Sequence, residues 1–148
     1  MTPRHWIALT ALISGIVATY LHLWKIGLAG TLACGGGHGC EVAQFSSYGY
    51  FLRQDVALIG AVGYALIFIT ALIGTRPSRL DDSRVTMALV ALILPAFLFT
   101  LRLKYGEFIV LKTFCPWCAV SATTITLHVL LVIADWRRVR RTMPPTSA

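Results

Sequence analysis

Residues 56–73 read VALIGAVGYALIFITALI, eighteen consecutive residues without a charged side chain. A helix of about 20 predominantly apolar residues is long enough to cross the hydrocarbon core of a bilayer. Asp55 precedes this stretch, and the helix-breaking sequence Arg76-Pro77-Ser78 follows it. The stretch therefore predicts a transmembrane helix.

Three further stretches have the same apolar character, at about residues 6–28, 85–103 and 114–136. Pro95, in the third span, predicts a kink or a carbonyl freed for a neighbouring helix. Only 13% of the residues are charged, against about 25% in soluble domains. We expect an all-α integral membrane protein, a single domain over residues 1–148 built as a four-transmembrane-helix bundle.

The Lys and Arg residues indicate the orientation of this bundle. Eight belong to the N-terminus, the connection between spans two and three, and the C-terminal end, whereas five lie near the other two connections. Because the more basic side is cytoplasmic, we expect both termini inside and the 1–2 and 3–4 connections outside. The net charge of +7 then fits basic residues that anchor the loops next to anionic lipid. Nucleic-acid binding is not indicated, because the sequence has no basic face with interleaved aromatic residues.

The first span has an alternative interpretation as a secretory or lipoprotein signal. Arg4 and His5 precede its apolar core, and Thr31-Leu32-Ala33-Cys34 follows it. The apolar stretch is long for a signal, however, and Lys25 interrupts its end. We therefore expect the first span to be retained as a transmembrane helix.

The four cysteines form two pairs. Cys34 and Cys40 enclose the sequence Gly-Gly-Gly-His-Gly in the 1–2 connection, and Cys115 and Cys118 form a Cys-Pro-Trp-Cys motif at the start of span four. The expected topology places all four thiols on the outer face, where disulfides persist. A dithiol and a quinone each exchange two electrons, and quinones dissolve in bilayers. The pairs therefore indicate a membrane thiol–disulfide relay.

The surroundings of the two pairs differ. A Cys-x-x-Cys at a helix N-terminus is suited to exchange because free amide N–H groups and the helix dipole stabilise a thiolate. Trp117 is expected in the interfacial aromatic belt or in the wall of a ligand pocket. The glycines beside Cys40 predict a mobile arm, which lets an attacking sulfur move into line.

Two other interpretations of the cysteines stay open. One is a fixed disulfide that closes the Cys34–Cys40 loop. The other is a zinc site of four cysteines, or of three cysteines with His38. We expect no metal, since four cysteines in an oxidising compartment favour disulfides.

Residues 45–53, which read FSSYGYFLR, crowd aromatic side chains into the outer connection. We expect this segment to lie in the membrane interface as a short in-plane helix that covers the outer mouth of the bundle. Its hydroxyl groups are candidates to bind a quinone carbonyl, although Ser46 and Ser47 are equally suited to cap a helix. His128 lies within span four and is a functional candidate if it faces the bundle interior.

Taken together, these features resemble the vitamin K epoxide reductase (VKOR) family in its compact, bacterial-type form. The resemblance rests on four spans, the cysteine pair in the 1–2 connection, the downstream Ser46-Ser47, and the Cys-x-x-Cys that opens span four. It covers nearly the whole chain. Quinone-linked disulfide oxidases of the DsbB kind also have four helices, but they carry their Cys-x-x-Cys in the first outer loop.

The resemblance implies a role for each cysteine. Cys118 would face a quinone of the menaquinone, ubiquinone or vitamin K type, with Cys115 as its partner. Cys40 would pass electrons to Cys115, and Cys34 would exchange with a separate thioredoxin-like or DsbA-like protein. Ser46 matches the loop serine of the family.

The sequence departs from the animal members of the family at two places near the expected quinone. Ala122 stands where they carry a tyrosine, and residues 54–56 (Gln-Asp-Val) stand where they carry an asparagine. We expect Asp55, with Ser46 and Trp117, to contact the quinone. The departures disfavour vitamin K epoxide as the substrate.

The sequence thus predicts a thiol–quinone oxidoreductase of a bacterial-type inner membrane, which supports disulfide formation by reoxidising a DsbA-like partner. Two alternatives remain. The first is a vitamin K quinone or epoxide reductase driven by a small dithiol, and the second is a membrane scaffold with two structural disulfides and no enzymatic activity.

Overall fold

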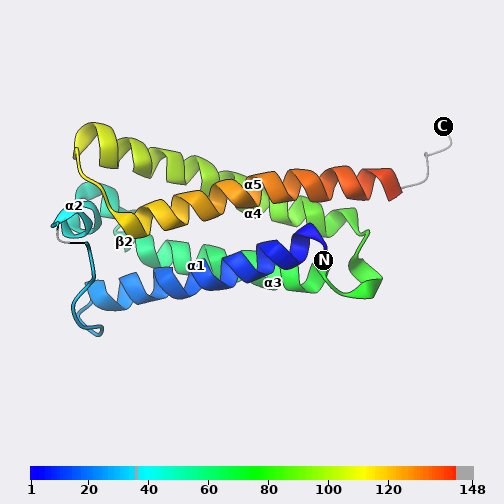
Figure 1. Ribbon diagram of the computed structural model, residues 1–148, viewed down its shortest axis with the longest axis horizontal. Coiled ribbons are helices and arrows are strands. Elements are labelled where there is room, and N and C mark those ends of the chain that lie inside the picture. Colours follow the sequence, from blue (N-terminus) through cyan, green and yellow to red (C-terminus); the bar gives the residue numbers. More distant parts are fainter. Residues whose placement is uncertain (36, 143–148) are drawn as a thin grey trace.

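A computed structural model of the protein describes residues 1–35 and 37–142 of the 148-residue chain. Its four long helices are α1 (Pro3–Lys25), α3 (Val56–Gly74), α4 (Ser83–Tyr105) and α5 (Pro116–Thr142) (Figure 1). A π-helical turn, η3 (Gly106–Val110), extends α4, and a short 3₁₀ turn, η2 (Pro77–Arg79), lies between α3 and α4.

Each long helix is long and apolar enough to cross a membrane, and the four predicted spans are confirmed. Their ends differ from the prediction by up to six residues, most at the C-terminal end of α5, which continues past Trp136 to Thr142. Polar side chains cap the starts of α3 and α4. Asp55 accepts the amide N–H of Ala57 at 3.1 Å at the start of α3, and Asp82 accepts that of Arg84 at 2.9 Å at the start of α4. The C-terminal tail beyond Thr142 and Gly36 of the glycine run lie outside the described residues.

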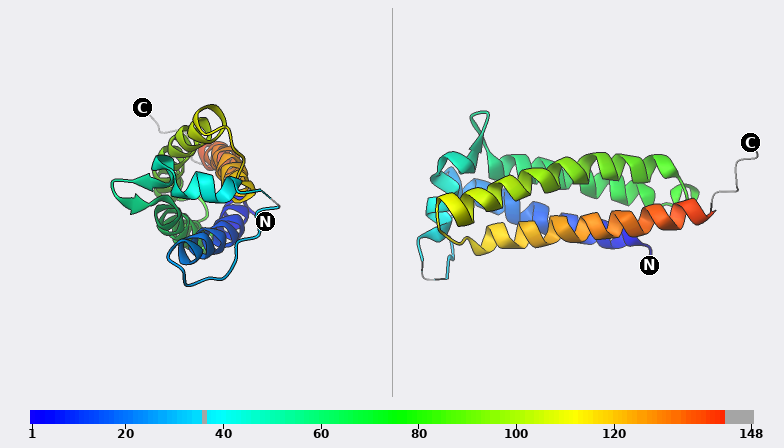
Figure 2. Two further views of the ribbon diagram at one scale, coloured as in Figure 1. Left: turned by 90° about the vertical axis from the view of Figure 1, so that its left-hand side faces the viewer. Right: turned by 90° about the horizontal axis from the view of Figure 1, so that it is seen from above.

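The four helices form a ring, seen end-on in Figure 2 (left). α1 and α4 lie on opposite sides, and each packs against both α3 and α5. Gly15 and Gly60 lie where α1 and α3 meet, and a β-carbon on them would make ordinary van der Waals contacts, at 3.4 Å from Tyr64 and 3.7 Å from Ala18. The interior of the ring is filled by apolar side chains, among them Ile7, Ala11, Ile67, Leu89, Ile93 and Ile125.

The outer face of the bundle is also apolar, as contact with lipid requires. Large hydrophobic side chains stand exposed along all four helices, including Ile16, Ile69, Leu98 and Leu130. A soluble helix bundle needs polar side chains on its outer face, whereas here that face carries apolar side chains. The protein is an integral membrane four-helix bundle.

Residues 39–55, here called the lid, lie at one end of the bundle. The lid comprises α2 (Gly39–Phe45), the 3₁₀ turn η1 (Ser47–Gly49), and a hairpin of β1 (Tyr50–Phe51) and β2 (Gln54–Asp55). Figure 2 (left) shows α2 lying across the end of the ring. A short helix was expected within residues 45–53, but the observed helix, α2, ends at Phe45 and carries Cys40. Residues 47–55 form η1 and the hairpin instead.

Lys25, the last residue of α1, fastens the lid to the bundle. Its Nζ donates to the carbonyl of Gly49 and to Asp55 Oδ1, both at 2.9 Å, and lies 3.8 Å from the ring centroid of Tyr50. His22 contributes a further hydrogen bond to Asp55 Oδ2 at 2.7 Å. Burial raises the pKa of Asp55, but the hydrogen bonds from His22 and Lys25 outweigh it, and the net pKa is lowered.

A buried ion pair closes the opposite end. Arg4, which the orientation count assigns to the N-terminus, is 0% exposed, and its Nε donates to Asp135 Oδ2 at 2.8 Å. The rest of the guanidinium donates to Thr86 Oγ1 at 2.9 Å and to the carbonyl of Gly74 at 3.1 Å. Because these residues belong to α1, α3, α4 and α5, one side chain ties the four helices together.

Candidate active site

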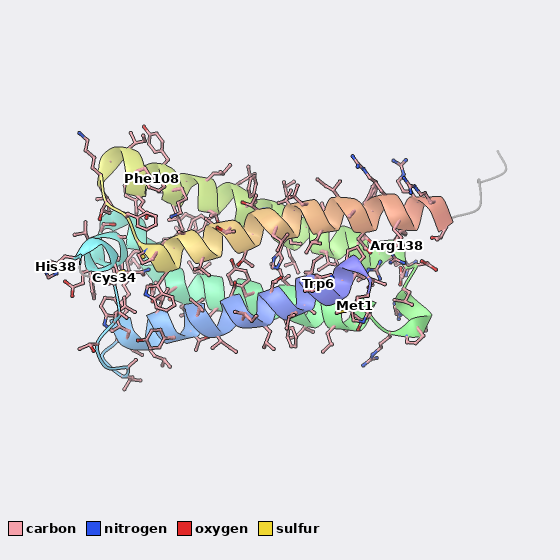
Figure 3. All side chains as sticks on the ribbon, in the orientation of Figure 1. Met1, Trp6, Cys34, His38, Phe108 and Arg138 are labelled. Carbon is pink, nitrogen blue, oxygen red and sulfur yellow. A yellow bond between two sulfur atoms is a disulfide. The ribbon has the colours of Figure 1, made fainter. Side chains whose placement is uncertain are left out.

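Both cysteine pairs lie at the lid end of the bundle. Cys34 and Cys40 form a disulfide with their Cα atoms 6.1 Å apart. Cys40, in the first turn of α2, is fully buried, whereas Cys34 is half-buried. Figure 3 shows Cys34 and His38 at the end of the molecule opposite Arg138. Cys34 is thus the more accessible cysteine of this pair.

The Cys-Pro-Trp-Cys motif stands at the N-terminus of α5, as predicted, with Pro116 as the first helical residue. Cys115 and Cys118 are free thiols, the first buried and the second half-buried. The Cys118 thiol donates a hydrogen bond to the Cys115 sulfur, and the amide N–H of Cys118 lies 3.4 Å from the same sulfur. Together these two contacts lower the pKa of Cys115 to about 7, although Cys115 is buried. Cys115 therefore readily loses its proton to become a thiolate.

The backbones that carry the two pairs are in contact. Gly39 packs so closely on Phe114 that a β-carbon on Gly39 would overlap the Phe114 carbonyl oxygen and lie 2.9 Å from Thr113 Oγ1. From the other side, Trp117 Nε1 donates to the carbonyl of Ala33 at 2.9 Å. The segments next to Cys40 and Cys34 are thereby held against the residues on either side of Cys115.

A cavity of about 480 Å³ opens inside the bundle beneath the lid. Side chains from all four long helices form its walls, and Ala43 and Gln44 of α2 form part of its roof. Cys118 lines the cavity, and Gln44 Nε2 lies 3.6 Å from its sulfur. Cys115 is not among the described residues that line it. One cysteine of the motif thus lines the cavity, while the other is fully buried and is not among its described lining residues.

The cavity wall is mainly apolar, with a few polar groups at separate places. Tyr64 hydrogen-bonds Ser121 at 2.8 Å on one side, one helical turn below Cys118, and Lys104 pairs with Glu107 at 2.7 Å on another. A volume within about 300–1,000 Å³, apolar walls and a few placed polar groups are typical of small-molecule sites. They fit a flat apolar ring that carries hydrogen-bond acceptors, as a quinone does.

The three residues predicted to contact a quinone are placed differently. Trp117 lines the cavity, whereas Ser46 and Asp55 are not among the described lining residues. Ser46 Oγ donates to the Ala43 carbonyl at 2.9 Å and accepts the amide N–H of Tyr48 at 3.3 Å, which is the capping role that the sequence left open. Asp55 caps α3 and binds Lys25. Both side chains shape the lid that covers the cavity.

Sequence reasoning missed most of the polar residues that line the cavity, and four of them stand out: Gln44, Tyr64, Lys104 and Glu107. Only the last two carried a recognisable signal, a Lys and a Glu three residues apart at the end of a span. Gln44 and Tyr64 are identified by the fold alone, since nothing near them in the sequence predicts that they face Cys118 or Ser121.

Two histidines were also named from the sequence, His38 as a possible zinc ligand and His128 as a functional candidate. His38 is exposed, and its ring lies 3.3 Å from the Glu41 carboxylate. Within residues 1–35 and 37–142, no group of three or more His, Cys, Asp or Glu side chains is arranged to hold a metal ion. His128 is buried in the bundle interior, where its Nε2 lies 2.8 Å from Thr10 Oγ1.

Comparison with known proteins agrees with this geometry. The chain has no significant match among curated proteins. The profile of the vitamin K epoxide reductase family matches residues 5–133, a range that includes both cysteine pairs, the lid and most of α5. Because this match covers most of the sequence, the chain belongs to the vitamin K epoxide reductase family.

Proposed function

We propose that the protein is a membrane thiol–quinone oxidoreductase that supports disulfide formation. Electrons pass from a separate thioredoxin-like protein to Cys34 and Cys40, then to Cys115 and Cys118, and finally to a quinone. Membership of a family that joins thiol and quinone redox chemistry supports the general activity. The observation that carries the proposal is the position of Cys118 on the wall of an apolar cavity, with the second pair packed against the same motif.

The first exchange takes place at the half-buried sulfur. A thiolate of the partner attacks Cys34 and releases Cys40, and the second thiol of the partner then releases Cys34. The partner leaves as a disulfide, and Cys34 and Cys40 become thiols. This order is supported by burial, because Cys40 is 0% exposed and an external thiolate cannot reach it in line.

The second exchange joins the two pairs. With Cys115 and Cys118 as a disulfide, the Cys40 thiolate attacks Cys115 and releases the Cys118 thiolate; Cys34 then attacks Cys40 and releases Cys115. The contact of Gly39 with Phe114 supports this pairing because it places the chain before Cys40 next to the chain before Cys115. Cys115 is a good leaving group, since hydrogen bonds from the Cys118 thiol and, secondarily, from backbone amides at the start of α5 stabilise its thiolate.

The last step regenerates the disulfide of the motif. Cys115 and Cys118 become joined as two electrons and two protons are transferred to a quinone, which becomes the hydroquinone. Menaquinone, ubiquinone and vitamin K types all share the flat ring and two carbonyl oxygens that the cavity suits. Gln44, the amide group next to the Cys118 sulfur, is suited to orient one of these oxygens.

We further propose that the lid end faces the outside of a bacterial-type inner membrane and that both termini are cytoplasmic. The distribution of basic residues supports this orientation. Intact cells treated with a reductant and a membrane-impermeant maleimide should show labelling of Cys34. Labelling of Cys34 only after the membrane is opened would reverse the orientation.

Turnover of the purified protein tests the proposed activity. A reduced thioredoxin-like protein and ubiquinone-1 are mixed with the wild-type protein in detergent, and loss of quinone absorbance is followed. We expect Cys118→Ala to fold and to abolish quinone reduction. Full turnover by Cys118→Ala would contradict the assignment, as would disulfides that neither thiols nor quinones can exchange, which is the behaviour of a scaffold. Replacing the quinone by vitamin K epoxide separates the proposed activity from epoxide reduction.

A second measurement tests the order of the relay. In the double variant Cys34→Ala, Cys118→Ala the two sulfurs that resolve the intermediate are gone, and the Cys40–Cys115 disulfide should accumulate. Peptide mapping identifies it directly. Its absence, with Cys40 and Cys115 both present as thiols under oxidising conditions, would contradict the relay.

A further inference from the structure

An ion pair between a buried carboxylate and a partly buried ammonium lies on the cavity wall, beside the Cys-Pro-Trp-Cys motif. Lys104 Nζ donates to Glu107 Oε2 at 2.7 Å, and Glu107 Oε1 accepts the amide N–H of Cys115 at 2.6 Å. The Glu107 side chain is 5% exposed and that of Lys104 is 17% exposed. One carboxylate thus connects a cysteine of the motif with a cation that lines the cavity.

The local backbone holds Glu107 in this position. It lies in the π-helical turn η3, a form that is rare and frequent at functional sites. Its carbonyl accepts the amide N–H of Thr113 at 3.0 Å, and the ring of Tyr48 packs on Gly106 with no room for a side chain there. The lid and the segment before α5 therefore hold the backbone of η3 at and next to Glu107 from two sides.

An ion pair is a costly way to satisfy one amide. Removing two charges from water is costly, and ionisable side chains within membrane-spanning segments are uncommon and usually functional. A neutral glutamine or serine also accepts an amide N–H. The charges of Lys104 and Glu107 therefore need a reason beyond holding the amide of Cys115.

The proposed quinone reduction supplies such a reason, because it moves protons as well as electrons. Two thiol protons must reach two quinone oxygens inside a mainly apolar cavity. Cys118 lines the cavity and can hand over its own proton directly. Cys115 is 0% exposed and is not among the described lining residues, so its proton needs a carrier.

We propose that Glu107 and Lys104 are this carrier, a proton relay from Cys115 to the bound quinone. The inference rests on the proposed function. Lys104 donates a proton to a quinone oxygen and regains one through Glu107, which receives the proton that Cys115 gives up. The two sulfurs supply two electrons and form one disulfide, and each proton that leaves a thiol arrives on a quinone oxygen.

The relay makes the pH dependence of turnover diagnostic. The charged and titratable groups around Glu107 are Lys104 on α4, Cys115 and Cys118 at the start of α5, and Tyr48 in η1. A variant without the carboxylate keeps all four of these groups. Because the Glu107 charge also raises the pKa of Cys115, the thiol titration of Cys115 is measured in the same variant, and only a change in the turnover profile beyond that titration reports proton transfer by the carboxylate.

The test compares variants in detergent with ubiquinone-1 as acceptor and dithiothreitol as reductant, which removes any dependence on a protein partner. We expect Glu107→Gln, which still accepts the amide N–H, to lower kcat about a hundredfold with KM within about twofold. Its pH profile should differ from that of the wild type, and Glu107→Asp should restore part of the activity. Lys104→Met should resemble Glu107→Gln. Asp81→Asn, an exposed carboxyl at the opposite end, is the matched control and should change nothing.

Three results would overturn the relay. One is a Glu107→Gln protein with kcat within twofold of the wild type. Another is an equal loss in Glu107→Gln and Glu107→Asp with an unchanged pH profile, because the carboxylate would then serve only to position Cys115. A wild-type protein that reduces no quinone contradicts the proposed function itself, and the relay with it. Thermal unfolding of each variant confirms that the rates belong to folded protein.

Discussion

Gly39 and Phe114 are in direct backbone contact, although 74 residues separate them in the sequence. The contact leaves no space for a β-carbon on Gly39. It joins the first residue of α2, which precedes Cys40, to the residue that precedes Cys115. The two redox pairs are thus held together by a glycine whose helix propensity alone would disfavour its place in α2.

Replacing this glycine should uncouple the pairs. Gly39→Ala favours the helical conformation of α2, yet its methyl group forces the lid away from Phe114. A displacement of about 1 Å costs up to about a hundredfold in rate, and we expect the Cys40–Cys115 disulfide to form at least about tenfold more slowly. The rate is measured in the Cys34→Ala, Cys118→Ala background.

Gly37→Ala is the matched control for this substitution. A β-carbon there meets only the amide nitrogen of Gly39, at 4.0 Å, so the rate should stay within about twofold of the parent. Equal rates in both alanine variants would show that the contact of Gly39 with Phe114 has no part in the exchange.

The lowered pKa of Cys115 predicts a pH dependence with a definite sign. Since the folded value is about 7 and an unfolded thiol titrates near about 8.5, the reduced protein gains unfolding free energy as the pH rises between these values. That gain is lost as the pH falls through about 7. Thiolate absorbance in a Cys34→Ser, Cys40→Ser variant should be half-maximal near pH 7.

The Cys118 thiol is the main cause of this lowered pKa, which provides the control. Removing it with Cys118→Ala in the same background should move the titration of Cys115 to higher pH. A titration that stays near pH 7 would assign the effect to the helix N-terminus alone.

The spans and the cysteine motifs could be predicted because their signals are local. An apolar run as long as residues 56–73 has few alternatives to a membrane helix, and a Cys-x-x-Cys before an apolar run marks a helix start. The short helix of the lid was predicted within residues 45–53, a few residues after its observed position at Gly39–Phe45. Its first residue, Gly39, is placed by packing on Phe114, a contact between distant segments that overrides local propensity.

The hairpin and the cavity could not be predicted for related reasons. Leu52 and Arg53 adopt positive φ angles of 50° and 66°, a conformation that usually calls for Asn or Gly in a two-residue hairpin turn. Gln44 meets Cys118 only because α2 lies across the bundle. Such residues take their roles from tertiary contacts, which leave no periodic pattern in the sequence.

The pairing of Lys25 with Asp55 should stabilise the lid. Both side chains are at least nine-tenths buried, so Asp55→Asn leaves an ammonium without its counter-charge, and we expect a loss of about 2 kcal/mol in unfolding free energy at pH 7. Because the folded pKa of Asp55 is lowered, this contribution is present above about pH 4 and is lost as the pH falls further. Denaturant unfolding in detergent at two pH values measures it.

A double-mutant cycle separates the ion pair from the other contacts of Asp55. Lys25→Met alone should also destabilise the lid, and the combined variant should lose less than the sum of the two single losses. Strict additivity would mean that the two side chains act independently and that the cap on α3 accounts for the effect of Asp55→Asn.

Arg4 at the opposite end should be needed for stability and dispensable for chemistry. Its planar guanidinium donates at once to Asp135, to Thr86 and to backbone carbonyls, a geometry that the single ammonium of a lysine cannot reproduce. Arg4→Lys should therefore lower the unfolding free energy by about 2–3 kcal/mol, while kcat for quinone reduction in the folded fraction stays unchanged, because Cys118 lies at the other end. The same exchange at the exposed Arg84 should cost less than about 0.5 kcal/mol. If Arg4→Lys and Arg84→Lys lose equal amounts of unfolding free energy, the buried hydrogen bonds of Arg4 contribute no more to stability than an exposed cation does.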